Sequence, residues 1–225
     1  MKYFKPILLV VVTTTFVTNS FAQHRRVVIK NGFSIGGGIT QFNILTDNFE
    51  TTQSNGWIIN ASATAEVPHK WYDVSYSIQL SDNNFEVAGL FFDEDVFIER
   101  QIEYNLMAAQ LSFLMHAKVV KNVFSIDFGP MLQYNSKLEL QSNNPENLAV
   151  RINETAVAAD AITNISQFNV NGVVGATLGF KYIKFRAQYI YGFTNILGKL
   201  NKEDIISKDF KGNQSLIALM ALINF

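Results

Sequence analysis

The sequence has no cysteine and little charge, and both absences limit what the protein can be. Without cysteine the chain forms no disulfide and cannot be lipid-anchored by the lipoprotein route. Only 16% of its 225 residues are charged, whereas about a quarter are charged in a typical soluble domain. This deficit suggests that part of the surface does not meet water. A formal net charge of -1 without a basic stripe also gives no reason to expect nucleic acid as a partner.

Long apolar runs are missing as well. After residue 22 no stretch reaches the roughly 20 apolar residues that a transmembrane helix needs, since Leu216–Phe225 is only about half that long. Residues 1–22 have the pattern of a cleaved export signal. That pattern consists of Lys2 and Lys5, an apolar run from Pro6 to Phe16, and Ser20-Phe21-Ala22. We therefore expect cleavage near Ala22 and a mature domain at residues 23–225.

What the chain does have is strand periodicity, seen best between Phe168 and Thr194. Two arms alternate with a period of two, which only an extended strand satisfies, and they fold back across a short turn. One face of each arm is apolar and ring-rich, whereas the other carries Asn, Gln, Thr, Gly and a single arginine. This reversed pattern is typical of a transmembrane β-hairpin. The apolar face is Phe168, Val170, Val174, Ala176, Leu178 and Phe180, then Phe185, Ala187, Tyr189, Tyr191 and Phe193.

The same alternation recurs along the chain, and the connections between strands alternate in length. Further strands are expected at residues 33–40, 57–67, 72–81, 107–116, 124–135 and 214–225. Long polar connections are expected at 43–55, 82–101, 136–166 and 195–212. These patterns predict an all-β fold, an eight-stranded antiparallel transmembrane β-barrel with up-and-down meander topology. Such a barrel belongs in the cell outer membrane, with both chain ends in the periplasm.

Two segments allow a second interpretation. Residues 107–116 also fit an amphipathic helix, but a strand is favoured because a turn at 119–122 leads straight into another alternating run. The connection at 136–166 has room for a short helix near Glu154–Ile162.

Five ionisable residues have inward parity and lie near strand ends beside the short turns. Buried charges are tolerated only when they are paired and hydrogen-bonded, so we expect an ion cluster that fills this part of the lumen. The alternative is a gate or proton-sensitive switch, because a histidine can change charge near neutral pH. The five are Glu66, Asp73, His116, Asp127 and Arg186.

Aromatic residues are predicted to form two girdles at headgroup depth. A soluble sandwich would instead leave the opposite strand faces charged, and they are not. The predicted interface residues are Trp57, Trp71, Tyr72, Tyr134, Phe168, Tyr182 and Tyr191, with Tyr104 also placed at the loop side.

Catalysis, metal binding and solute transport are not expected. The three histidines, His24, His69 and His116, lie away from the acidic residues of the outer connections. Asp82 and the run 93–95 offer oxygen ligands for calcium, but their spacing matches no calcium loop. We therefore predict a non-enzymatic protein without metal or cofactor. Eight strands enclose a lumen that side chains fill, which leaves at most a narrow ion channel as an alternative.

Three short motifs resemble the PorT-like outer-membrane β-barrel family. They are residues 188–196 (QYIYGFTNI), residues 127–130 (DFGP) followed by Leu132 and Tyr134, and the terminal Phe225. The resemblance spans about residues 32–225 and implies an eight-stranded barrel. It also implies insertion by the barrel-assembly machinery, which recognises a terminal aromatic such as Phe225. The best-known member of the family belongs to the type IX protein secretion pathway.

Two functions remain open at this point. One is an accessory of protein secretion or envelope assembly, with secretion-system or periplasmic proteins as partners in addition to outer-membrane lipid. The other is a structural or surface-interaction barrel that binds extracellular ligands through its long loops.

Overall fold

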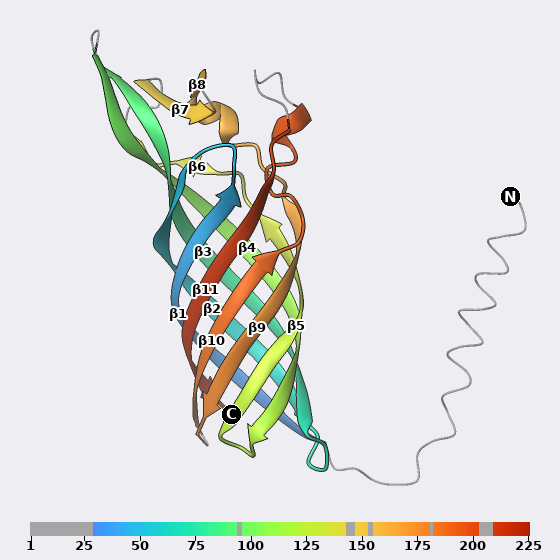
Figure 1. Cartoon of the computed structure of the whole chain (residues 1–225). Coiled ribbons are helices and arrows are strands. Elements are labelled where there is room, and N and C mark those ends of the chain that lie inside the picture. Colours follow the sequence, from blue (N-terminus) through green and yellow to red (C-terminus); the bar gives the residue numbers. More distant parts are fainter. Residues whose placement is uncertain (1–28, 94–95, 143–146, 153–154, 181, 203–208) are drawn as a thin grey trace, which may run out of the picture.

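The computed structural model of the chain describes residues 29–93, 96–142, 147–152, 155–180, 182–202 and 209–225. The predicted leader, residues 1–22, lies outside this range. β6, β7, β8 and the 3-10 turns gather at one end, here called the outer end, and the short turns lie at the opposite, inner end (Figure 1). In chain order the elements are β1 (Lys30–Thr46), β2 (Thr51–Glu66), β3 (Tyr72–Asp93), β4 (Val96–Val120), β5 (Phe124–Asn135), β6 (Glu139–Leu140), β7 (Leu148–Ile152), β8 (Thr155–Ala158), η2 (Ala159–Ile162), β9 (Phe168–Gly179), β10 (Ile183–Gly192), η3 (Leu200–Lys202) and β11 (Gly212–Asn224).

The long strands close into an antiparallel barrel. Each pairs with its neighbour in the order β1-β2-β3-β4-β5-β9-β10-β11, and β11 pairs back to β1 from Ser34↔Asn224 to Thr46↔Gly212. The expected eight-stranded up-and-down meander is therefore confirmed. No helix among the described residues has the length and apolar character needed to cross a membrane.

The barrel wall between its two ends has the reversed polarity of a membrane barrel. On β3, Ser77 and Gln79 are buried in the lumen while Ile78 is 61% exposed on the outside. Residues 107–116 form part of β4 in the same way, so the strand is confirmed and the helix alternative is wrong. Because apolar side chains point outward on every strand of the ring, this band contacts lipid.

Toward the outer end the polarity inverts. On β3, Phe85 and Val87 face the interior with no exposed surface, while Glu86 between them faces outward. On β4, Ile102 and Tyr104 face the interior and Glu103 faces outward. These segments have the ordinary arrangement of a water-soluble sheet, with apolar side chains inside. The switch of the apolar face from outside to inside therefore marks where the strands leave the lipid.

This inversion explains the main error in the predicted connections. Residues 82–101 are not a loop, because β3 and β4 continue as a paired ribbon as far as Asp93↔Val96. The polar run at 82–84 stays in the strand because Asn83 turns inward, where its side chain bonds Thr40 and Ser81.

The other outer connections also hold more structure than expected. β1 and β2 extend until only residues 47–50 separate them. The segment 136–166 contains β6, β7 and β8, and β7 adds to the edge of β3. The short helix for which residues Glu154–Ile162 had room does not form at residues 155–158, which are β8, and the 3-10 turn η2 follows.

Candidate functional site

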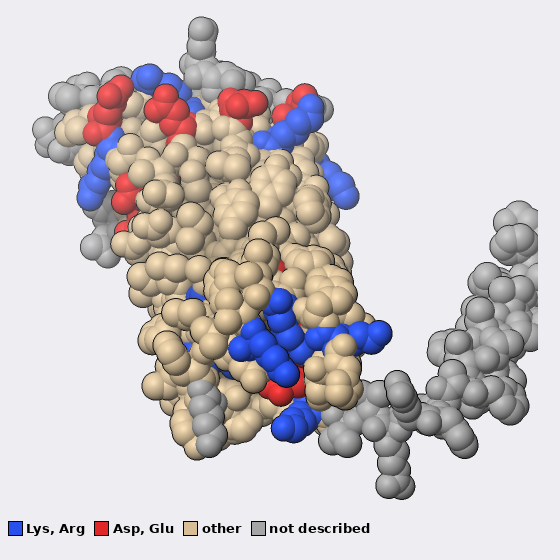
Figure 2. Space-filling model, turned by 60° about the horizontal axis from the view of Figure 1, so that its bottom comes forward, with Lys and Arg blue, Asp and Glu red and all other residues tan. Residues whose placement is uncertain are grey.

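Charged side chains lie at the two ends of the barrel. Figure 2 shows a wide uncharged band on the face turned to the viewer, with acidic and basic groups mixed at the outer end and mostly basic groups at the inner end. The two ends therefore offer different chemistry, and each is a candidate site.

At the inner end, Asp127 is the centre of a buried polar cluster. Its carboxylate has no exposed surface, and one oxygen lies 2.7 Å from Nδ1 of His116 and accepts from Ser125 at 2.7 Å. The other oxygen accepts from the hydroxyl of Thr177 and lies 3.7 Å from Nε of Arg186. The fold thus brings three of the five predicted cluster residues together, with Ser125 and Thr177 as partners that the sequence analysis did not include.

Asp73 takes part in a separate ion pair. Its Oδ1 lies 2.7 Å from Nζ of Lys118 and accepts from the backbone N–H of Val67 at 2.8 Å. The ammonium of Lys118 also donates to the carbonyl of Val67 at 3.1 Å. Lys118 has the same inward parity as His116, and that parity was the available signal for finding it.

The partners of Asp127 and the Asp73–Lys118 pair line one cavity of about 380 Å³ beside the short turns. Glu66, the fifth predicted residue, lies in its wall, and so does Lys184, which sequence reasoning missed. Among the described residues, neither the Glu66 carboxylate nor the Lys184 ammonium has a hydrogen-bond or ion-pair partner. The predicted cluster is therefore divided into two separate groups, one around Asp127 and one around Asp73. Glu66 belongs to neither group.

Above this cavity the lumen is filled by amide side chains. Gln133 and Gln214 donate to each other's oxygens at 2.7 and 2.8 Å, and Asn171 donates to Gln133 at 2.9 Å. Gln79 donates to Gln188 across the lumen at 3.0 Å. Cross-lumen bonds of this kind tie opposite walls together and occupy the space that a solute would need.

The outer end of the lumen is closed by an apolar cluster that we call the outer plug. Its members are fully buried or nearly so and come from the barrel wall and from the outer connections. Tyr104, predicted at the membrane surface, is among them, and its hydroxyl donates to the carbonyl of Ala159 at 2.8 Å. The outer plug comprises Phe42, Ile44, Phe85, Val87, Ile102, Tyr104, Leu106, Ile162, Ile165, Leu197, Leu200 and Phe210.

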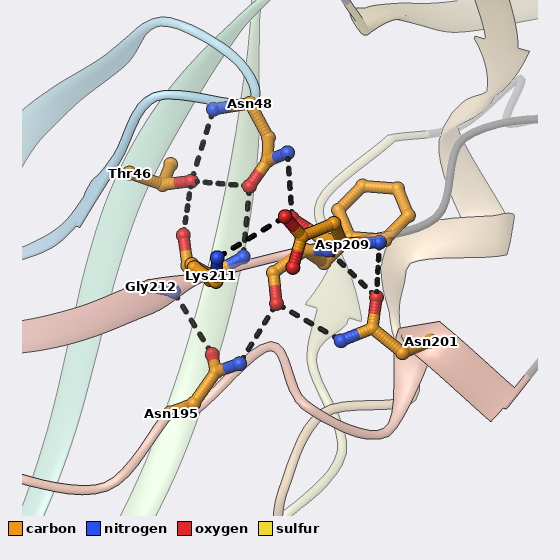
Figure 3. A network of polar contacts seen from close by, with 8 residues as sticks. Thr46, Asn48, Asn195, Asn201, Asp209, Lys211 and Gly212 are labelled. Carbon is orange, nitrogen blue, oxygen red and sulfur yellow. Dashed lines mark hydrogen bonds and ion pairs between the residues drawn. The ribbon is translucent and has the colours of Figure 1, made fainter.

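A polar network holds Phe210 in this plug (Figure 3). The Phe210 carbonyl accepts from Asn195 at 2.7 Å and from Asn201 at 3.0 Å, and its N–H donates to Asn201 at 2.6 Å. Asn48 accepts from the N–H of Lys211 at 2.9 Å. Phe210 is thereby held by Asn195 and Asn201, and the next residue, Lys211, is bonded to the β1–β2 connection, so this part of the plug has a defined position.

Next to this network, the outer end carries a broad concavity of about 1240 Å³. It lies between the β1–β2 connection, the β3–β4 ribbon and β7. Its wall is polar and of mixed charge, including Glu50, Glu99, Arg100, Arg151 and Lys211.

The filled lumen predicts that the protein does not conduct ions in the steady state. The amide layer and the outer plug lie in series, and the plug excludes water and charge. We expect no steady current when the refolded mature chain is inserted into planar bilayers. An ohmic conductance in every insertion event would contradict the blocked lumen and support the channel alternative.

The predicted interface aromatics lie on the outer surface of the barrel. Trp71 and Tyr182 are 61% and 62% exposed beside the short turns, and Tyr134 lies opposite Phe168 at the other end of the band. Tyr72 and Tyr191 are partly buried, Trp57 is exposed, and Phe225 is 73% exposed with its ring 6.3 Å from that of Phe33.

The acidic residues considered for calcium do not come together in the described part of the chain. Asp82 lies on β3, where it accepts from Asn105, and residues 94–95 lie outside the described ranges. Where the chain is described, no group of three or more His, Cys, Asp or Glu residues is placed to hold a metal ion.

A closed eight-stranded barrel with an apolar outer band and a filled lumen defines a small transmembrane β-barrel protein. Its fold is similar to that of Neisserial surface protein A (9% identity, TM-score 0.45, 86% of this chain and 97% of that one). It is also similar to Ail of Yersinia pestis, solved with the heparin analogue sucrose octasulfate (14% identity, TM-score 0.49, 87% of this chain and 99% of that one). A third similar structure is OprG of Pseudomonas aeruginosa (10% identity, TM-score 0.45, 88% of this chain and 97% of that one).

No family model matches the sequence, and no curated protein matches it. The resemblance to the PorT-like family therefore stays a prediction.

Proposed function

We propose that the protein is a non-enzymatic outer-membrane barrel that binds extracellular partners through its outer end. The aromatic residues at both edges of the apolar band would lie at headgroup depth, and the short turns would face the periplasm. In this orientation the β3–β4 ribbon, β7–β8 and the concavity face away from the cell.

The observation that carries this proposal is the outer plug. Loops that only connect strands are usually mobile and solvated. Here Leu148, Val150 and Ile152 of β7 are buried in the same apolar core as the outer plug, to which Ile162 of η2 belongs. A core of this kind gives the outer end a fixed shape. A fixed, concave, polar surface lowers the entropic cost of binding a partner.

The experiment removes the ribbon and keeps the barrel. Residues 88–101 are replaced by Asn-Gly, which favours a two-residue hairpin turn. Binding of the wild type and of this variant to arrays of immobilised glycans and extracellular-matrix proteins is then compared. We expect saturable binding by the wild type, a loss of at least tenfold in the variant, and unchanged gel mobility before and after boiling for both. Equal binding by the two folded proteins would refute the proposal.

A second candidate function, an accessory of protein secretion or envelope assembly, is favoured by the charged cavity at the inner end, which would face periplasmic proteins. It is also the function that the PorT-like resemblance implies. Deletion of the gene separates the two. Exported proteins stranded in the periplasm would support the secretion role, whereas normal export with altered adhesion would support the surface role.

A further inference from the structure

We infer that the inner-end cavity binds a phosphate-bearing ligand through Lys184 and Arg186. Both side chains lie on β10 with inward parity, two residues apart, and both line the cavity. A strand places such side chains next to each other on the same face. The site is independent of the function proposed for the outer end.

Unused hydrogen-bond donors are the first argument. Arg186 is 3% exposed, and its Nε donates to the hydroxyl of Thr177 at 3.0 Å. Its Nη1 is buried and has no hydrogen-bond partner among the described residues. A guanidinium presents five N–H donors in a fixed fork, and leaving a buried charged donor unpaired is costly. The ammonium of Lys184 adds donors without a partner in the described part of the chain.

The acidic residues in and beside the cavity do not meet this need. Asp73 is occupied by Lys118 and the Val67 N–H, and Asp127 already accepts from or contacts four groups. Only Glu66 is left, and it lines the same cavity as two cations with unused donors. An oxyanion between Lys184 and Arg186 would also reduce the repulsion between these two positive charges.

The balance of charge at the inner end favours an anion too. Near the short turns the described residues include six basic groups against three acidic ones, and Figure 2 shows the basic excess at this end. A net positive charge at this end raises the local concentration of anions. The basic groups are Lys30, Lys70, Lys118, Lys121, Lys184 and Arg186, and the acidic ones are Glu66, Asp73 and Asp127.

Size and lining indicate phosphate rather than a smaller anion. The volume of about 380 Å³ lies within the usual range for small-molecule sites. A phosphate group offers more acceptor oxygens than a carboxylate, which suits an arginine fork beside a lysine. Phe124 and Phe180 line the same cavity, so an apolar extension of the ligand would be accommodated. The ligand is thus either free phosphate or the phosphate of a membrane lipid headgroup.

The test uses the refolded mature chain in non-ionic detergent and isothermal titration calorimetry with two probes, inorganic phosphate and dihexanoyl phosphatidylglycerol. We expect saturable binding of at least one probe, weakened about tenfold or more by Lys184→Gln, because one charge-assisted bond is lost. Arg186→Lys keeps the charge but removes the fork, and it should also weaken binding. The matched control is Lys211→Gln, a lysine at the outer end paired with Asp209 at 3.1 Å, which should bind like the wild type.

The two probes distinguish the sources of phosphate. Binding of both points to a soluble phosphate ligand, and binding of the lipid alone points to a headgroup. The inference is overturned if the folded wild type binds neither probe, or if Lys184→Gln, with unchanged mobility before and after boiling, binds as tightly as the wild type.

Discussion

Asp127→Ala is expected to lower the free energy of unfolding by about 3 kcal/mol or more, the usual cost of removing one partner of a buried ion pair. The carboxylate is completely buried and interacts with Ser125, His116, Thr177 and Arg186. Without it the buried guanidinium of Arg186 loses its ion-pair partner. Equilibrium unfolding in urea, followed by tryptophan fluorescence in lipid vesicles, measures the change.

Two further variants make this prediction specific. Glu99→Ala removes a carboxylate from an exposed pair, 4.0 Å from Arg151, and should cost less than about 0.5 kcal/mol. The double variant Asp127→Ala with Arg186→Met removes both buried charges, so it should be more stable than Asp127→Ala alone. A loss below about 1 kcal/mol for Asp127→Ala, or no recovery in the double variant, would show that the cluster does not hold the barrel together.

The membrane-embedded part of the fold follows from the sequence because lipid outside and a polar lumen inside impose one simple rule on each strand. Trp57, Ile78 and Phe185 point outward while Ser62, Gln79 and Arg186 point inward, as the period of two predicts. The rule fails beyond the lipid, where Phe85 and Tyr104 turn their rings inward. A prediction that points every apolar residue outward therefore ends the strands too early and places Tyr104 at the membrane surface instead of in the plug.

The candidate site was predictable only in part, for a different reason. Parity shows that a side chain enters the lumen, but it does not show which partner it meets across the barrel. His116 and Asp127 lie on neighbouring strands and are opposite each other in the register, so their pairing follows once the topology is known. Lys118 and Lys184 were missed because a lysine beside a turn normally extends to water. The outer plug depends on contacts between segments far apart in the sequence, which no local pattern encodes.

Closure of the barrel at the β1–β11 seam should be the step most sensitive to small substitutions. A Cβ added to Gly36 would lie 2.0 Å from the carbonyl oxygen of Ala221, and one added to Gly38 would lie 1.8 Å from that of Leu219. Both oxygens belong to the backbone of β11, so neither clash is relieved by moving a side chain. Glycines at such positions let a sheet bend sharply enough to close.

We expect Gly36→Ala and Gly38→Ala each to lower the free energy of unfolding by about 2–3 kcal/mol, the upper range for an inserted methyl group in a packed site. In the double variant, Gly36→Ala with Gly38→Ala, most of the protein should fail to form a closed barrel. Gel mobility before and after boiling measures the closed fraction, and urea unfolding measures the stability of the single variants. Gly32→Ala is the matched control on the same strand, because its Cβ would meet nothing closer than Asn224 Oδ1 at 3.7 Å. If Gly38→Ala folds as completely as Gly32→Ala, then the seam has enough freedom to separate β1 from β11, and the close approach of the two backbones is not what closes the barrel.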